Sequence, residues 1–98
     1  MKCIDYVKAS KYRKDILLNI DNNLKLPSEI SKEVGIRINH VSKTLKQLKE
    51  VNLVVCVNEE AKKGRLYQTT ERGKGVIDYL TKEFNPKKHK NSYIIYND

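Results

Sequence analysis

The chain has 98 residues, 39% hydrophobic and 33% charged, which predicts one globular domain over residues 1–98 with its own core. No apolar run approaches the roughly 20 residues of a membrane span, and the first ten residues contain an acid and lack the apolar centre of a signal peptide. The formal net charge is +8, and residues 37–65 carry seven basic and three acidic groups. This excess predicts a polyanionic partner; a lysine-rich surface that serves only solubility is the open alternative.

Residues 10–20 are the first segment with a helical period. Tyr12, Ile16 and Ile20 recur every four residues and predict one apolar helix face, which Leu17 widens. The polar run 21–23 ends this helix. For the residues before it, two interpretations stay open: a backward extension of the same helix, or a short arm.

A helix-turn-helix is predicted over residues 27–53, PSEISKEVGIRINHVSKTLKQLKEVNL. Pro27 suits the first turn of the leading helix, because no N–H is required there. Gly35 suits the left-handed turn after it, and the small Ser31 lets the second helix cross closely. The second helix, 38–51, carries one apolar stripe: Ile38, Val41, Leu45 and Leu48.

A β-hairpin and a last helix follow. Asn52 can adopt the left-handed cap after the second helix. The apolar run 53–57 predicts a strand, 58–64 a hairpin loop and 65–70 the returning strand, with Tyr67 and Thr69 facing inward. Thr70 is the expected N-cap of the last helix, whose apolar face consists of Val76, Ile77, Leu80 and Phe84. A basic and then apolar tail covers 85–98, after the Asn85-Pro86 stop.

Catalytic and metal-binding patterns are missing from the sequence. Cys3 and Cys56 lack the spacing of a zinc or redox pair, and Cys56 lies in a strand as a small buried hydrophobe. His40 and His89 have no ligand partners nearby in the sequence. No nucleophile–base motif or phosphate-binding glycine loop is present. We therefore expect no enzyme, no metal, no cofactor and no membrane partner, and the unpatterned cysteines fit the reducing environment of the cytoplasm.

The order of these elements resembles a family. The run 41–50, VSKTLKQLKE, is similar to the recognition helix of the ArsR- and MarR-type transcriptional regulators of bacteria and archaea. Residues 63–65 look like their wing tip, and 67–73, YQTTERG, like the entry to their last helix. The resemblance covers about 10–84 and implies an α+β, mainly α, winged helix-turn-helix: a three-helix core, a two-stranded wing and a C-terminal helix. Asn52, Thr69 and Arg37 depart from the family pattern, and the metal-binding cysteine box is absent.

Double-stranded DNA is the partner that this resemblance implies. With the apolar stripe facing the core, Asn39, Lys43, Lys46, Gln47 and Glu50 point outward. Asn39 and Gln47 suit adenine, Arg37 or Lys43 guanine, and Ser42, Lys46 and Lys49 phosphates. A solvated helix face is the alternative. The residues expected to bind DNA are Arg37, Asn39, His40, Ser42, Lys43, Lys46, Gln47, Lys62, Lys63 and Arg65.

We also predict which residues of the wing affect DNA binding and which residues form a dimer contact. Arg65 suits the minor groove or a phosphate, whereas Glu59 and Glu60 either face away from DNA or weaken the contact of the wing, 58–65. We expect a homodimeric, sequence-specific transcriptional regulator. Its expected dimer contacts are Ile77, Leu80, Phe84, Ile94 and Ile95, with core packing the alternative for Ile77 and Leu80. The alternative function is a winged-helix module that binds proteins in a transcription, replication or RNA-processing complex.

Overall fold

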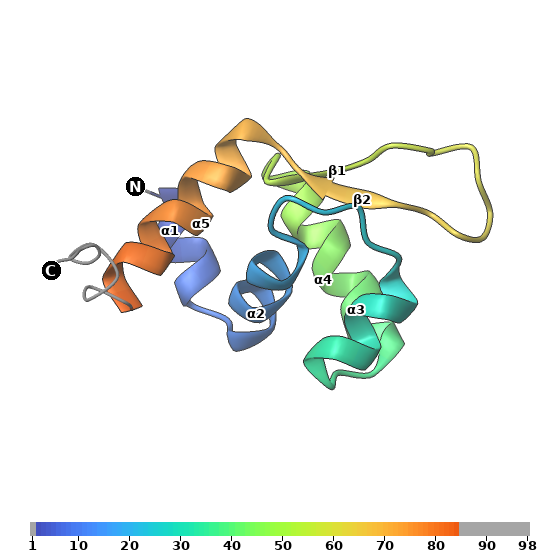
Figure 1. Ribbon diagram of the computed structural model, residues 1–98, viewed down its shortest axis with the longest axis horizontal. Helices are drawn as coiled ribbons and strands as arrows, with labels where there is room; N and C mark the ends of the chain where they lie inside the picture. Colours follow the sequence, from blue (N-terminus) through green and yellow to red (C-terminus); the bar gives the residue numbers. More distant parts are fainter. Residues whose placement is uncertain (1, 85–98) are drawn as a thin grey trace, which may run out of the picture.

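The structure is a computed structural model that describes residues 2–84. In this part of the chain five helices and one antiparallel hairpin follow in the order α1 (Lys2–Lys8), α2 (Lys11–Ile20), α3 (Pro27–Val34), α4 (Ile38–Glu50), β1 (Val54–Cys56), β2 (Tyr67–Thr69) and α5 (Glu71–Phe84). The hairpin runs out on the side of α3 and α4, whereas α1 and α5 lie at the other end of the molecule (Figure 1). The predicted winged helix-turn-helix fold is confirmed.

The core lies where α2, α4 and α5 meet beneath the hairpin. Every helix and β1 contribute fully or nearly fully buried aliphatic side chains to one cluster. The predicted core positions of α2, α4 and α5 are confirmed for the following residues: Ile16, Leu17, Ile20, Val41, Leu45, Leu48, Val76, Ile77 and Leu80. Cys56 is buried as expected. A contiguous apolar cluster of this kind supplies the main driving force for folding.

Two predicted core positions are wrong. Tyr12 is 41% exposed, because its place in the first turn of α2 carries it past the core to the side of α4. Ile38 is 50% exposed, because the first residue of α4 lies beyond the edge of the core that Val41 reaches. Both fit the helical period, so the spacing of apolar residues alone places them on the buried faces.

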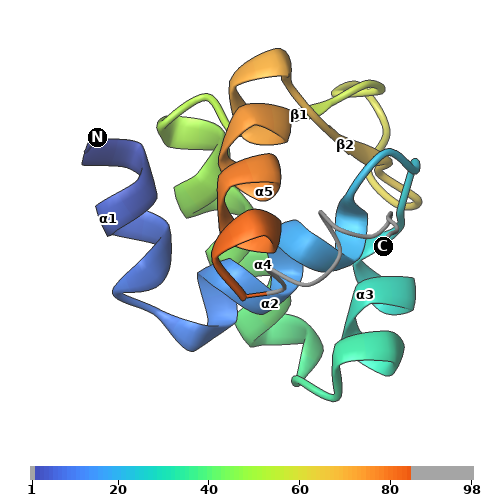
Figure 2. The same ribbon diagram turned by 60° about the vertical axis from the view of Figure 1, so that its left-hand side comes forward.

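Residues 2–8 form a helix of their own, which neither open interpretation included. Ile4 and Val7 of α1 are buried in the core. Ser10 separates α1 from α2 because its extended backbone and its Oγ, which accepts from the N–H of Arg13 (3.3 Å), cap α2. Figure 2 shows α1 standing beside α5, on the side away from α3.

Hydrogen bonds join the hairpin to the segment before α3 and close its base. Lys25 forms an isolated antiparallel bridge with Tyr67, with N–O distances of 3.0 and 2.9 Å, which ties the segment before α3 to β2. At the base of the hairpin, Thr70 donates its N–H to Leu53 O (3.0 Å) and its Oγ1 hydrogen to Asn52 O (2.7 Å). Asn52 has the predicted positive φ of 64°. Thr70 also caps α5 as predicted, since Oγ1 accepts from Gly73 N (3.0 Å).

Candidate nucleic-acid interface

The turn before α4 fixes the direction of this helix. Gly35 adopts the predicted left-handed conformation, with φ 78°, and donates its N–H to Ser31 O (2.9 Å). Ser31 does more than allow a close crossing, because its Oγ donates to Ile36 O (2.5 Å) and so closes the turn. Arg37 is the N-cap of α4 and makes no side-chain capping bond. Its guanidinium is exposed at the start of the helix and free to contact a ligand.

The outer face of α4 is polar and mostly basic. Val41, Thr44, Leu45 and Leu48 are buried beneath it. Six of the expected DNA-binding residues are exposed along this helix: Arg37, Asn39, His40, Ser42, Lys43 and Lys46. Because Asn39, Lys43 and Lys46 lie opposite the buried stripe, they present amide and ammonium groups to whatever approaches α4.

Gln47 does not join this face. Its Oε1 accepts a hydrogen bond from Arg13 Nε of α2 (3.3 Å), and the side chain is half-buried. Recognition of adenine by an amide side chain uses both its oxygen and its nitrogen. In this structure Gln47 links α4 to α2, and its contact with a base stays a prediction.

Arg13 and its neighbours are residues that the sequence pattern did not point to. The Arg13 guanidinium lies 3.8 Å from the ring centre of Tyr6 and donates to Tyr6 O (3.0 Å). On the same flank of α4, the rings of Tyr12 and His40 lie 5.4 Å apart at 51°. The Arg13–Tyr6 contacts join α2 to α1, and the Tyr12–His40 contact joins α2 to α4 over a long sequence separation, which no local signal predicts.

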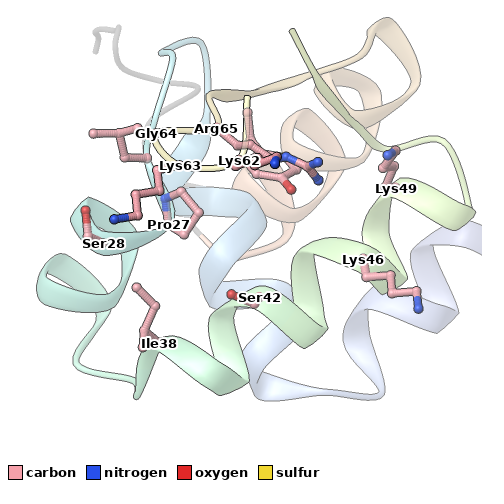
Figure 3. Close-up of a pocket in the computed structure, with 12 residues that line it drawn as sticks. Pro27, Ser28, Ile38, Ser42, Lys46, Lys49, Lys62, Lys63, Gly64 and Arg65 are labelled. Carbon is pink, nitrogen blue, oxygen red and sulfur yellow. The ribbon is translucent and has the colours of Figure 1, made fainter. Parts of the chain in front are cut away.

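A groove of about 670 Å³ runs between α4, the start of α3 and the wing. In Figure 3 the wing passes above α4, and Ile38 and Ser42 rise from α4 toward it. Five basic residues line the groove: Lys46, Lys49, Lys62, Lys63 and Arg65. Its other lining residues include Leu26, Pro27, Ser28, Ile38, Ser42 and Tyr67. A concave surface with this charge attracts polyanions.

The wing loop has a defined shape despite its polar sequence. Asn58 Oδ1 accepts from Leu66 N (2.8 Å), and Asn58 Nδ2 donates to Gly64 O (3.1 Å). From the other side of the loop, Arg65 donates to Ala61 O (2.7 Å) and to Glu59 O (3.0 Å). These four bonds hold the loop, with Lys62 and Lys63 exposed at its tip.

Arg65 is held by the wing loop, and its expected contact with a phosphate stays a prediction. Its Nε and one Nη are engaged by carbonyl groups of the loop, and its side chain is half-buried. A guanidinium held in this way cannot extend from the wing into a minor groove without giving up two hydrogen bonds. Arg65 lines the groove beside α4 and shapes the wing, while the two lysines supply the charge at the tip.

An ion pair crosses the groove between helix and wing. Lys49 Nζ of α4 lies 2.5 Å from Glu59 Oε2. The hydrogen bond from Lys49 is the largest cause of a lowered pKa at Glu59, and the same bond raises the pKa of Lys49. From the sequence, Glu59 is expected either to face away from DNA or to weaken the contact of the wing with it. The ion pair supports the second interpretation, because the carboxylate engages a lysine of the basic surface.

The expected dimer contacts lie in two different places. Ile77 and Leu80 are only 8% and 0% exposed and pack in the core of their own chain. A buried side chain is unavailable to a second chain, so these two residues are corrected to core positions. The side chain of Phe84, together with Ile94 and Ile95, lies outside the residues that the structure describes.

Comparison with known proteins agrees with this geometry. A family model described as winged helix-turn-helix matches residues 10–89. No curated protein and no solved structure matches the chain significantly. Among the described residues no helix is long and apolar enough to cross a membrane.

Proposed function

Because the chain belongs to the winged helix-turn-helix family, we propose that it is a sequence-specific transcriptional regulator that binds duplex DNA through α4 and the wing. The family suggests DNA binding; the ArsR/MarR-like subfamily and the action on nucleoid DNA in the cytoplasm are part of the proposal. One observation carries the proposal: the polar, basic face of α4 adjoins a groove with five cationic side chains, two from α4 (Lys46 and Lys49) and three from the wing (Lys62, Lys63 and Arg65).

The proposed docking follows the general geometry of the motif. The N-terminal half of a recognition helix enters the major groove, which brings Arg37, Asn39 and Lys43 to base edges. Asn39 suits adenine, and Arg37 or Lys43 suits guanine. The sugar–phosphate strand beside the major groove then follows the part of the groove that Lys46 and the wing line, and the end of the groove at Ile38, the first residue of α4, faces the base edges. Ser42, Lys46, Lys62 and Lys63 contact its phosphates there.

Binding to two half-sites requires a second copy of the chain. One such helix offers few base contacts, and two-fold dimers read half-sites about one helical turn apart. We propose a homodimer, with Phe84, Ile94 and Ile95 as the remaining candidate contacts. Sedimentation of the full chain tests this; a protein that stays monomeric at tens of micromolar and on a paired site removes the dimer from the proposal.

Fluorescence anisotropy with random duplex DNA tests the central claim. If about six phosphates are contacted, affinity falls roughly a thousandfold between 50 and 200 mM salt. Asn39→Ala and Lys43→Ala each change the preferred sequence, at about 1–3 kcal/mol for one base pair. Lys46→Ala weakens all sequences alike. Absence of binding at low salt would refute the proposal, and identical behaviour of the three variants would refute this orientation of α4.

One observation favours the alternative function, a protein-binding module. Val55 of β1 and Val57, which follows the strand directly, are both exposed and lie two residues apart on the hairpin. An apolar pair on a sheet surface suits a protein partner more than DNA. If Val55→Ser abolishes co-purification of a partner while DNA binding is absent in the unmodified chain, the interaction module replaces the regulator.

A further inference from the structure

Ile38 is an apolar side chain on the basic surface of the protein. It is the first residue of α4 and is half exposed, whereas Val41 and Leu45 on the same helix are almost completely buried. Its side chain lines the groove together with Ser42 of α4 and Pro27 of α3 (Figure 3). Exposure to water gives Ile38 little of the stabilisation that core burial gives an isoleucine.

The surroundings of Ile38 define what it can contact. Arg37 precedes it, and Ser42 and Lys46 follow it along the same flank of α4, so polar and cationic groups surround a single apolar one. Phosphates are charged and offer no apolar group for the Ile38 side chain to contact. Base edges in the major groove present one exposed apolar group, the C5-methyl of thymine.

We propose that Ile38 determines sequence specificity by packing against the C5-methyl group of a thymine in the major groove. This inference rests on the proposed function, because it requires the start of α4 to enter that groove. Arg37, Ser42 and Lys46 fix the position of the helix by polar contacts. Ile38 then distinguishes thymine from cytosine or uracil through the methyl group alone.

Removing the methyl group from the DNA tests the contact directly. A preferred duplex is first selected from a random pool, and each of its thymines is then replaced singly by deoxyuridine, which keeps the base pair. One thymine per half-site is expected at which the replacement weakens binding about four-fold, the factor that corresponds to burial of one methyl group. At that thymine, Ile38→Ala binds the thymine and uracil duplexes equally.

A matched variant and three outcomes make the test decisive. Val55→Ala removes another exposed aliphatic side chain, on β1, and keeps the uracil penalty. Circular dichroism checks that Ile38→Ala is folded, as expected for a half-exposed position. Tight binding without any uracil penalty overturns the inference alone, and so does a full penalty in Ile38→Ala. Absence of DNA binding by the unmodified chain overturns the proposed function together with it.

Discussion

Replacing Glu59 by glutamine tests whether the wing competes with DNA for a lysine. In the free protein the Glu59 carboxylate holds Lys49 Nζ at 2.5 Å in the groove proposed for a phosphate strand. Because the hydrogen bond from Lys49 lowers the pKa of Glu59, the carboxylate stays ionised throughout the neutral range. A DNA phosphate that approaches Lys49 therefore competes with this carboxylate for the ammonium group. Glu59→Gln removes the competing charge and releases the lysine.

The size of the effect follows from counterion release. One additional lysine–phosphate contact steepens the dependence of log K on log salt by about 0.9, which corresponds to at most about eight-fold tighter binding at 0.1 M salt. The wing keeps its shape in this variant, because Arg65 binds the backbone carbonyl of Glu59 and not its side chain. The gain therefore does not come with a rearranged loop.

Glu60→Gln is the matched control. It removes the neighbouring acid and raises the net charge by the same amount, but the structure gives Glu60 no ion pair with Lys49. Anisotropy titrations between 50 and 300 mM salt are expected to show the steeper slope only for Glu59→Gln, and Lys49→Ala is expected to abolish that gain. If Glu59→Gln binds no more tightly than Glu60→Gln, or more weakly, the ion pair positions the wing and does not compete with DNA.

Three further predictions concern the scaffold. Gly73→Ala is expected to cost about 1–3 kcal/mol of unfolding free energy or more, because the added Cβ would lie 2.1 Å from the backbone oxygen of Leu53. Gly75→Ala is the control: its Cβ meets open space, so it stabilises α5 by about 0.5–1 kcal/mol. Equal melting temperatures of the two variants would contradict the packing at Gly73. Asn58→Ala loses two loop bonds, so the melting temperature falls by a few degrees and DNA affinity falls for all sequences alike; a change confined to one base pair would argue against a shaping role. The pKa of Glu33 is lowered, chiefly by the hydrogen bond from Lys25, so its stabilising contribution exists above the pKa of an unfolded glutamate and disappears as the pH falls through the lowered value. Thermal melts from pH 7 to 3 should therefore fall less steeply for Glu33→Gln than for the unmodified chain, and parallel curves would refute this.

Features with a local cause could be predicted from the sequence. Gly35 and Asn52 have the expected positive φ angles, since each follows the last turn of a helix. Thr70 caps α5 because a hydroxyl at that position reaches the N–H three residues on. The order of helices and strands follows from these stops and from the apolar periods between them.

Features that depend on distant partners could not be predicted. The Arg13–Gln47 bond joins residues 34 apart in the sequence, and the Lys49–Glu59 pair depends on how the wing folds back toward α4. By its period, the apolar stripe of α4 includes Ile38. The core of the folded chain, however, buries this stripe only from Val41 onward, which the period cannot show. The sequence pattern therefore pointed to the exposed face of α4 and the wing loop, while the contacts of the individual side chains required the packed structure.

Because the base of the hairpin is closed, the length of the wing can change without separating the two ends of the hairpin. Thr70 ties its strand to both Asn52 and Leu53, so the two ends of the hairpin stay together whatever lies between them. The exposed tip at Lys62 and Lys63 is the kind of site where insertions are tolerated, and doubling the length of a flexible loop costs only about 0.6 kcal/mol. Glycine–serine insertions between these two lysines would extend the reach of the wing along a duplex, so that footprint length could be engineered separately from the base preference of α4.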